Sequence, residues 1–195
     1  MKKKITLIGL AVVALLLVGL LSSLAFLTDK KDVTNTFTVG KVKIDLAEPA
    51  YLVGDDPLKL LPGTEIDKDP TVTLLEGSEE AYVFMQIVYV DGIENLLEDI
   101  EIGANWLPVT DADDLYVYSD GDDPTAVSAA TADKVLEPLF TQIVVDNELE
   151  NDDFNVVDPK LIIRAYAHQA WVNEAEAYDT AKANALTWAA TSVTP

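Results

Sequence analysis

Polar and apolar residues alternate along much of the chain, and the alternation is clearest between positions 33 and 46. In the range 33–39, one face of an extended chain carries Val33, Asn35, Phe37 and Val39. The other face carries three threonines, and β-branched and aromatic residues at a period of two are typical of a β-strand. Gly40 then permits a bend or a bulge. A second half-buried strand is predicted beyond it, with Val42, Ile44 and Leu46 on its apolar face.

Further strands are predicted between clusters of turn residues. Pro62 and Gly63 form a corner before an alternating strand that ends at Leu75. The range 81–90 is nearly all apolar, so we expect it to be a central strand that is covered on both faces. Shorter strands are expected within the ranges 105–109, 115–118, 142–145 and 161–170.

Three segments have helical features. Apolar residues at helical spacing predict a short surface helix over 93–102, and an alanine-rich range, 126–137, predicts another short helix in a loop. At about 174–190, alanine is frequent and acids occupy the first turn, where the helix dipole favours them. We expect an amphipathic helix there, with a docking stripe of Tyr178, Ala181, Ala185 and Trp188.

Short strands between turns, together with a few helices, predict an all-β protein. The expected architecture is a jelly-roll or Greek-key β-sandwich with short peripheral helices and a C-terminal helix. We assign residues 41–195 to this domain and residues 26–40 to a separate N-terminal segment.

The first 25 residues have the layout of a secretory signal peptide. Three lysines precede an apolar run from Ile5 to Leu27, and the small residues Ser23 and Ala25 lie where a signal peptidase cleaves. We place cleavage between Ala25 and Phe26. The alternative is an uncleaved membrane anchor, because the run approaches the roughly 20 apolar residues that a membrane-spanning helix needs.

The chain is strongly acidic. Its formal charge is −21, and removal of the three leader lysines leaves −24. Such a surface repels nucleic acid and anionic lipid and attracts divalent cations or basic partners. The chain has no cysteine, so an exported domain of this sequence is stabilised by packing, partners or ions and not by disulfides.

Catalytic chemistry has little support in the residues. His168 is the single histidine, and a zinc protease of the usual kind needs two histidines one helical turn apart. We therefore expect His168 to be a strand-face residue, with no catalytic residue, cofactor-binding residue or metal ligand assigned. With 34 acidic residues, the nearness of two carboxylates identifies nothing.

Several loops and aromatic residues have a second interpretation. The acidic clusters at 111–114, 120–123 and 151–153 offer oxygen ligands of the kind that calcium takes, but none has the spacing of a helix-loop-helix calcium loop. We favour solvated loops and keep calcium as the weaker alternative. Trp106, Trp171 and Trp188 are expected in the core or beneath a docked helix rather than on a carbohydrate platform. Tyr116 and Tyr118 share one face of a predicted strand. The alternative for these two side chains is exposure to solvent.

The chain resembles the TasA/camelysin group of exported bacterial proteins. The matching stretches cover most of the sequence after the leader and are weakly specific one by one. They are 24–29, 34–40, 42–46, Pro62-Gly63, 67–72, 77–79, 138–140 and 165–170.

The resemblance implies a jelly-roll subunit of extracellular biofilm fibres, in which the N-terminal strand of one subunit completes the sheet of its neighbour. It also implies processing by a dedicated signal peptidase. Camelysin-type relatives are described as metalloproteases, but this chain lacks the histidines of a zinc site, so we do not carry that activity over.

We therefore expect a secreted structural protein of a bacterial matrix or cell surface, whose partners are copies of itself. Strand exchange would use a donor segment with the residues Phe26, Leu27, Val33, Asn35, Phe37 and Val39. We expect no nucleic-acid partner, and a membrane contact only through an uncleaved leader. The alternatives are a membrane-anchored or wall-associated binding domain and a camelysin-like secreted metalloprotease. The alternative for the segment itself is that 33–39 is the first strand of its own domain.

Overall fold

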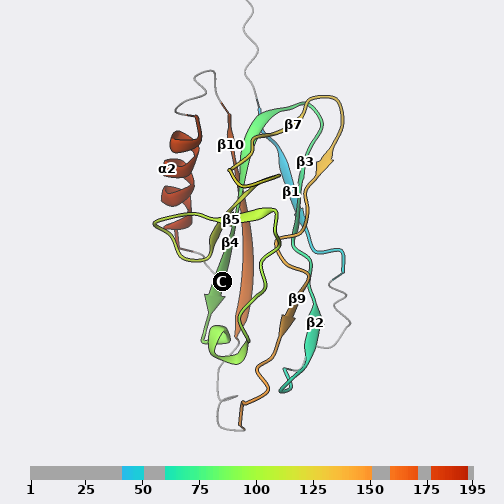
Figure 1. Ribbon diagram of the computed structural model, residues 1–195, viewed down its shortest axis with the longest axis vertical. Coiled ribbons are helices and arrows are strands. Elements are labelled where there is room, and N and C mark those ends of the chain that lie inside the picture. The colour runs from blue at the N-terminus through green and yellow to red at the C-terminus, as the bar shows by residue number, and fades with distance from the viewer. Residues whose placement is uncertain (1–40, 51–59, 151–158, 171–176, 193–195) are drawn as a thin grey trace, which may run out of the picture. The chain divides into compact units, whose positions relative to one another are not determined.

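The computed structural model describes residues 41–50, 60–150, 159–170 and 177–192 (Figure 1). The chain divides into two units, 1–39 and 40–195, and all described residues belong to the second. The expected signal peptide and donor segment lie outside the described residues.

The second unit is built from antiparallel sheets, as the sequence predicts. The first sheet has the order β1 (Ile44–Ala47), β3 (Thr71–Leu74) and β8 (Lys134–Val135). The second has the order β10 (Lys160–Gln169), β4 (Ser78–Val90), β6 (Leu115–Tyr118) and β5 (Trp106–Pro108), and β7 (Val127–Ala129) also pairs with β4. The third consists of β2 (Glu65–Asp67) and β9 (Gln142–Val144).

Side chains from all three sheets meet in one core. Alternation along each strand directs every second side chain inward, so the core-facing residues come from positions two apart. The buried members include Ile66, Val72, Leu74, Val83, Met85, Ile87 and Ile143. Since these residues bury nearly all of their surface, their packing is the main source of stability in a domain without disulfides.

The opposite face of the second sheet is covered by α2 (Ala177–Ala189), as Figure 1 shows. Ala181 and Ala185 are fully buried in a second apolar cluster with Phe84 of β4 and Val117 of β6. Small side chains on this stripe let the helix approach the sheet closely. The C-terminal helix and its stripe are therefore confirmed, with residues 174–176 outside the described range.

Arg164, the single arginine of the chain, fastens the end of this helix to β10. Its guanidinium donates to the carbonyl oxygens of Thr191 (3.1 Å) and Trp188 (3.3 Å) and lies 4.4 Å from the centroid of the Trp188 ring. Gln86 adds a hydrogen bond to the carbonyl of Ala189 (3.4 Å). The last carbonyls of a helix have no partner within the helix, and a cation there also complements the helix dipole.

The long central strand and most of the short ones are confirmed. β4 pairs with β10 on one side and with β6 and β7 on the other, and its buried side chains point to both faces. β1 shows the predicted alternation, because Ile44 and Leu46 are half-buried and their neighbours are exposed.

Two predicted helices are wrong. The range 126–137 forms β7 and β8, because Val127, Ala129 and Leu136 fill the core and their backbones pair with β4 and β3. Within 93–102 only a 3₁₀ turn forms, Ile93–Leu96, which buries its first and last residues. In both segments, pairing or burial outweighs the local preference of the residues for helix.

Replacement of Arg164 by Ala is expected to destabilise the domain by about 1–3 kcal/mol, because it leaves helix-end carbonyls without charge-assisted donors. Chemical denaturation followed by tryptophan fluorescence measures this loss. Lys182→Ala is the matched control on the same helix, since its partner Asp111 is exposed and surface pairs contribute about 0–1 kcal/mol. Equal losses in the two variants would contradict the proposed role of Arg164 as a clamp.

Candidate functional site

Two strands that end their sheets, β1 and β10, lie next to each other on one side of the domain. Among the described residues, β1 pairs only with β3, and β10 pairs only with β4. Cα atoms of β1 and β10 approach within 8 Å, so both open edges belong to the same side. Main-chain groups on an open edge are free to pair with another strand.

The core is incompletely covered along this side. The inward residues of β10, which include Leu161, Ile163 and Ala165, pack against the core but remain partly exposed. Their neighbours on β4, Met85 and Ile87, are at most 3% exposed. Apolar surface is therefore accessible beside β10, where a further strand would cover it.

β10 also lacks several of the features that usually protect an edge. Its ten residues pair with β4 in unbroken register, from Lys160 opposite Val90 to Gln169 opposite Ala81. The strand contains neither proline nor an inward-pointing charge, and its inward side chains are apolar apart from Gln169 at the end. Natural proteins commonly use such features to prevent edge-to-edge association.

The residues assigned to the donor segment and to the cleavage site lie outside the described residues. They are Ala25, Phe26, Leu27, Val33, Asn35, Phe37 and Val39. The structure does describe the residues that follow them: the Lys41 carbonyl accepts from the Glu79 amide (3.0 Å), and the Lys43 carbonyl from the Leu75 amide (3.0 Å). Ser78 adds side-chain hydrogen bonds to the backbone of Lys43. The domain therefore holds the chain at Lys41 and Lys43.

His168 lies on the outer face of β10, as expected. Its Nδ1 atom is 3.0 Å from the Tyr166 hydroxyl, and Tyr166 stacks on the Trp188 ring. In the part of the chain that the structure describes, no group of three or more His, Cys, Asp or Glu side chains is placed to hold a metal ion. His168 thus lies beside Tyr166, which packs against Trp188 of α2.

The acidic loops are organised by their own hydrogen bonds. The Ser119 hydroxyl lies 2.7 Å from the Gly121 carbonyl and 2.6 Å from the Asp123 carbonyl, and the Thr125 hydroxyl donates to the Asp120 carboxylate. The loop at 111–114 is tied to α2 through the Lys182 ammonium, 3.1 Å from Asp111. The cluster at 151–153 lies outside the described residues. Calcium binding by these loops stays a prediction.

Asp114 lies in a cluster with Tyr89 and Tyr116. Burial and the nearby Asp113 raise the pKa of the Asp114 carboxyl above its usual value. Burial, followed by the charge of Asp114, raises the pKa of Tyr89 to about 12. The Asp114 backbone has a positive φ of 56°, and its carbonyl accepts from the Ile87 amide (2.9 Å). The Asp114 carboxylate thus lies where burial and Asp113 disfavour its negative charge. Its position is fixed because the Asp114 carbonyl is hydrogen-bonded to β4.

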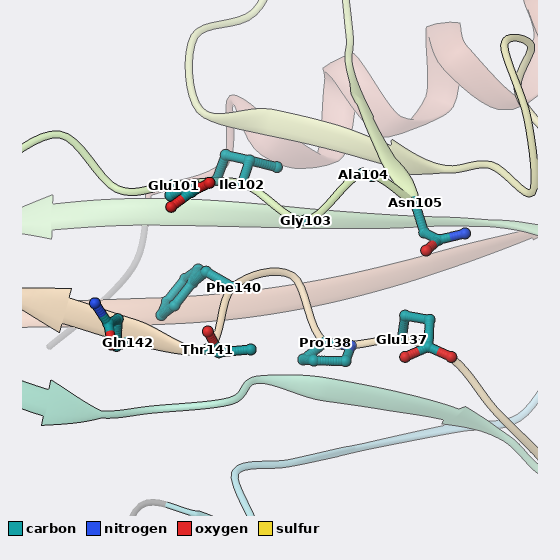
Figure 2. Close-up of a pocket in the computed structure, with 10 residues that line it drawn as sticks. All are labelled: Glu101, Ile102, Gly103, Ala104, Asn105, Glu137, Pro138, Phe140, Thr141 and Gln142. Atoms are coloured by element: carbon teal, nitrogen blue, oxygen red, sulfur yellow. The ribbon is translucent and has the colours of Figure 1, made fainter.

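A cavity of about 560 Å³ separates the segments 101–105 and 137–142 (Figure 2). Its lining includes Glu101 and Glu137 but no basic side chain or histidine. The two walls are joined by a hydrogen bond from the Gly103 amide to the Leu139 carbonyl (2.8 Å). The lining therefore offers carboxylates without a partner for acid–base or nucleophilic chemistry.

The aromatic residues are mainly structural. Trp106 is 3% exposed and donates its indole N–H to the Glu137 carbonyl (3.0 Å). Trp188 packs against Tyr166 and Arg164 of β10, as expected for a residue where a helix docks. Trp171 lies outside the described residues. Exposure of Tyr118 is contradicted, because Tyr118 is 8% exposed and packs edge-on against Trp106.

Comparisons with protein-family models, curated proteins and solved structures find no match to this chain. None of the helices in the described ranges is long and apolar enough to cross a membrane.

Asp114→Asn is expected to raise the midpoint of thermal unfolding at pH 7. The raised pKa means that the folded domain binds the proton more tightly than the unfolded chain, so wild-type stability falls as pH rises through that pKa. The advantage of the variant disappears below about pH 4, where the wild-type carboxyl is protonated in both states. Asparagine tolerates the positive φ better than most residues.

The same variant is expected to lower the pKa of Tyr89, measured by tyrosinate absorbance, because a neighbouring negative charge is removed. Asp122→Asn removes the same charge from an exposed loop and serves as the control. An equal stabilisation by both variants would show that net charge, and not the position of Asp114, is responsible.

Proposed function

We propose that this chain is a secreted structural subunit of an extracellular bacterial fibre or matrix, and that its subunits assemble by exchange of an N-terminal strand. The open side formed by β1 and β10 carries this proposal. We further propose that the sheets follow a jelly-roll topology, that a dedicated signal peptidase releases Phe26, and that the partners are copies of the same chain. The proposal assigns no catalytic role.

Strand exchange accounts for the features of the open side together. An incoming strand supplies main-chain hydrogen bonds to the free edge, and its alternate side chains cover the accessible part of the core. A segment that leaves one subunit and pairs with the next forms a heterologous contact, which produces a filament when it does not close. The predicted alternation of 33–39 suits this role.

The distribution of charge does not oppose contact between the segment and a second domain. Residues 26–40 contain two lysines and two aspartates, whereas residues 41–195 contain eight basic and 32 acidic residues. The segment is therefore neutral and the domain strongly acidic. Repulsion between the acidic domains opposes nonspecific association, and this repulsion does not act on the neutral segment.

The mature chain, residues 26–195, is expected to form filaments that electron microscopy detects, and residues 40–195 are expected to remain monomeric. Truncation removes the donor strand but leaves the compact second unit intact. Circular dichroism and thermal unfolding of both chains show whether the shorter one folds. Filaments formed by a folded 40–195 chain would overturn the proposal.

Calcium or mild acid is expected to speed filament growth of the mature chain, because either one reduces repulsion between acidic domains. Light scattering at constant ionic strength, with and without calcium, measures the effect. Sodium chloride at the same ionic strength separates screening from specific ion binding. Unchanged growth in acid, calcium and salt would contradict a controlling role for this repulsion.

A further inference from the structure

We propose that the acceptor for this exchange is the outer edge of β10, which pairs with no strand among the described residues, and that residues 33–39 of a second copy pair with it antiparallel, with Phe37 beside Ala165. This inference rests on the proposed function and adds the docking surface, the direction of the strand and its register. Each of these follows from a separate observation.

Length and burial favour β10 over β1. β10 offers ten residues in continuous register, whereas β1 has four. A seven-residue donor can pair with β10 along its whole length. The half-buried inward residues of β10 also supply apolar surface that the donor would cover, which adds to the main-chain hydrogen bonds.

The sizes of the inward side chains set the register. Along β10 they change from large to small, with Leu161 and Ile163 followed by Ala165 and Ala167. The largest side chain on the apolar face of the donor is Phe37. Beside Ala165 the phenyl ring finds room and lies next to a fully buried part of the core, since Ala165 pairs with Met85.

The antiparallel direction suits the remaining side chains. It places Val39 beside Ile163 and the polar Asn35 beside Ala167, toward the end of the strand at Gln169. A parallel strand in the same register would place Asn35 beside Ile163 instead. Antiparallel pairing is also slightly the more stable of the two patterns.

Charge is compatible with this contact. β10 contains Lys160 and Arg164 but no carboxylate, although the domain is strongly acidic. The range 33–39 contains no charged residue, and its second face consists of threonines. The two strands therefore meet without like charges opposite each other.

The anchoring of Lys41 makes the contact head-to-tail. The Glu79 amide is hydrogen-bonded to the Lys41 carbonyl, and the Ala170 amide to the carbonyl of the adjacent Glu80. Lys41, where the N-terminal segment joins the domain, therefore lies near the Gln169 end of β10 in the same subunit. An antiparallel donor runs toward the Lys160 end of the acceptor strand before it enters its own domain. Opposite ends of successive subunits therefore meet, and such a contact propagates as a filament.

The same anchoring opposes pairing of the segment with β10 of its own chain. Lys41 and Lys43 are fixed by main-chain hydrogen bonds, so the segment would have to reverse just before Lys41. The tightest common hairpins need two loop residues, and a reversal there would use Val39 as well as Gly40. Val39 would then be lost from the pairing.

Cysteine cross-linking tests the acceptor directly, because the chain has no cysteine of its own. One mature chain carries Phe37→Cys and another carries Ala165→Cys. Cross-strand neighbours have Cβ atoms about 4.5–5.5 Å apart, close enough for a disulfide after a small adjustment. When the two are mixed and oxidised, a disulfide-linked heterodimer is expected on a non-reducing gel.

Three further pairs test the alternatives. Val39→Cys with Ile163→Cys is expected to cross-link, whereas Val39→Cys with Ala167→Cys is expected to react much less, as the antiparallel register requires. Phe37→Cys with Leu46→Cys tests β1 as the acceptor. A single chain with both Phe37→Cys and Ala165→Cys is expected to give a ladder of oligomers, and an internal disulfide in a monomer would overturn pairing between copies.

The outcomes separate this inference from the proposed function. Filaments of the unmodified mature chain together with cross-links at Leu46 but not at Ala165 would overturn β10 as the acceptor and leave strand exchange standing. Absence of filaments from the unmodified chain would instead overturn the proposed function.

Exchanging the sizes of the side chains at positions 37 and 165 gives a second test, in which the rate of filament growth is measured. Misfolding caused by the first substitution would not be reversed by the second. Ala165→Leu fills the place of the phenyl ring and is expected to slow filament growth at least tenfold. Phe37→Ala in the same chain is expected to restore much of the rate, because the total volume of the pair is then similar. Additive losses in the double variant would overturn the predicted register.

Discussion

The antiparallel ladder between β4 and β10 is the interaction on which the rest of the structure depends. Its ten paired positions join residues about 80 apart in the sequence, and they place the second-longest strand of the described chain at the end of the sheet. One face of β10 thereby contributes to the core, and the other presents Arg164 and Tyr166 to α2. Among the described residues, no strand lies along its outer edge.

In this arrangement the two faces of β10 contribute to stability, and its outer edge is the part proposed for association. The outer face is closed by the helix, whose end is held by Arg164 and Gln86. The inner face is anchored by its contacts with β4 and the core. In the proposed exchange, an incoming strand would therefore add its apolar contacts at the edge of β10 and not at either packed face.

Strand positions could be predicted from the sequence because alternation is a local property, as in β1, β3 and β6. The failure at 126–137 has a nonlocal cause: alanine favours helix, but Val127 and Ala129 bury more surface when they pair with β4. The order of strands is also nonlocal, so the sequence could not show that β10 has an open edge. Arg164 is the single arginine of the chain and stands out in a predicted strand. Its role at the end of α2 could not be predicted, because its partners Trp188 and Thr191 lie 24 and 27 residues away.

The proposed interface of main-chain groups is well suited to a domain as acidic as this one. A side-chain interface on the domain would bring carboxylates together, since 32 of the 38 charged residues in the range 44–195 are acidic. The free edge of β10 avoids this cost because the strand has no carboxylate and its inward residues are largely apolar. Repulsion elsewhere on the domain would then oppose other contacts more than it opposes the proposed one, so the charge that opposes association in general would also make the proposed strand contact more specific.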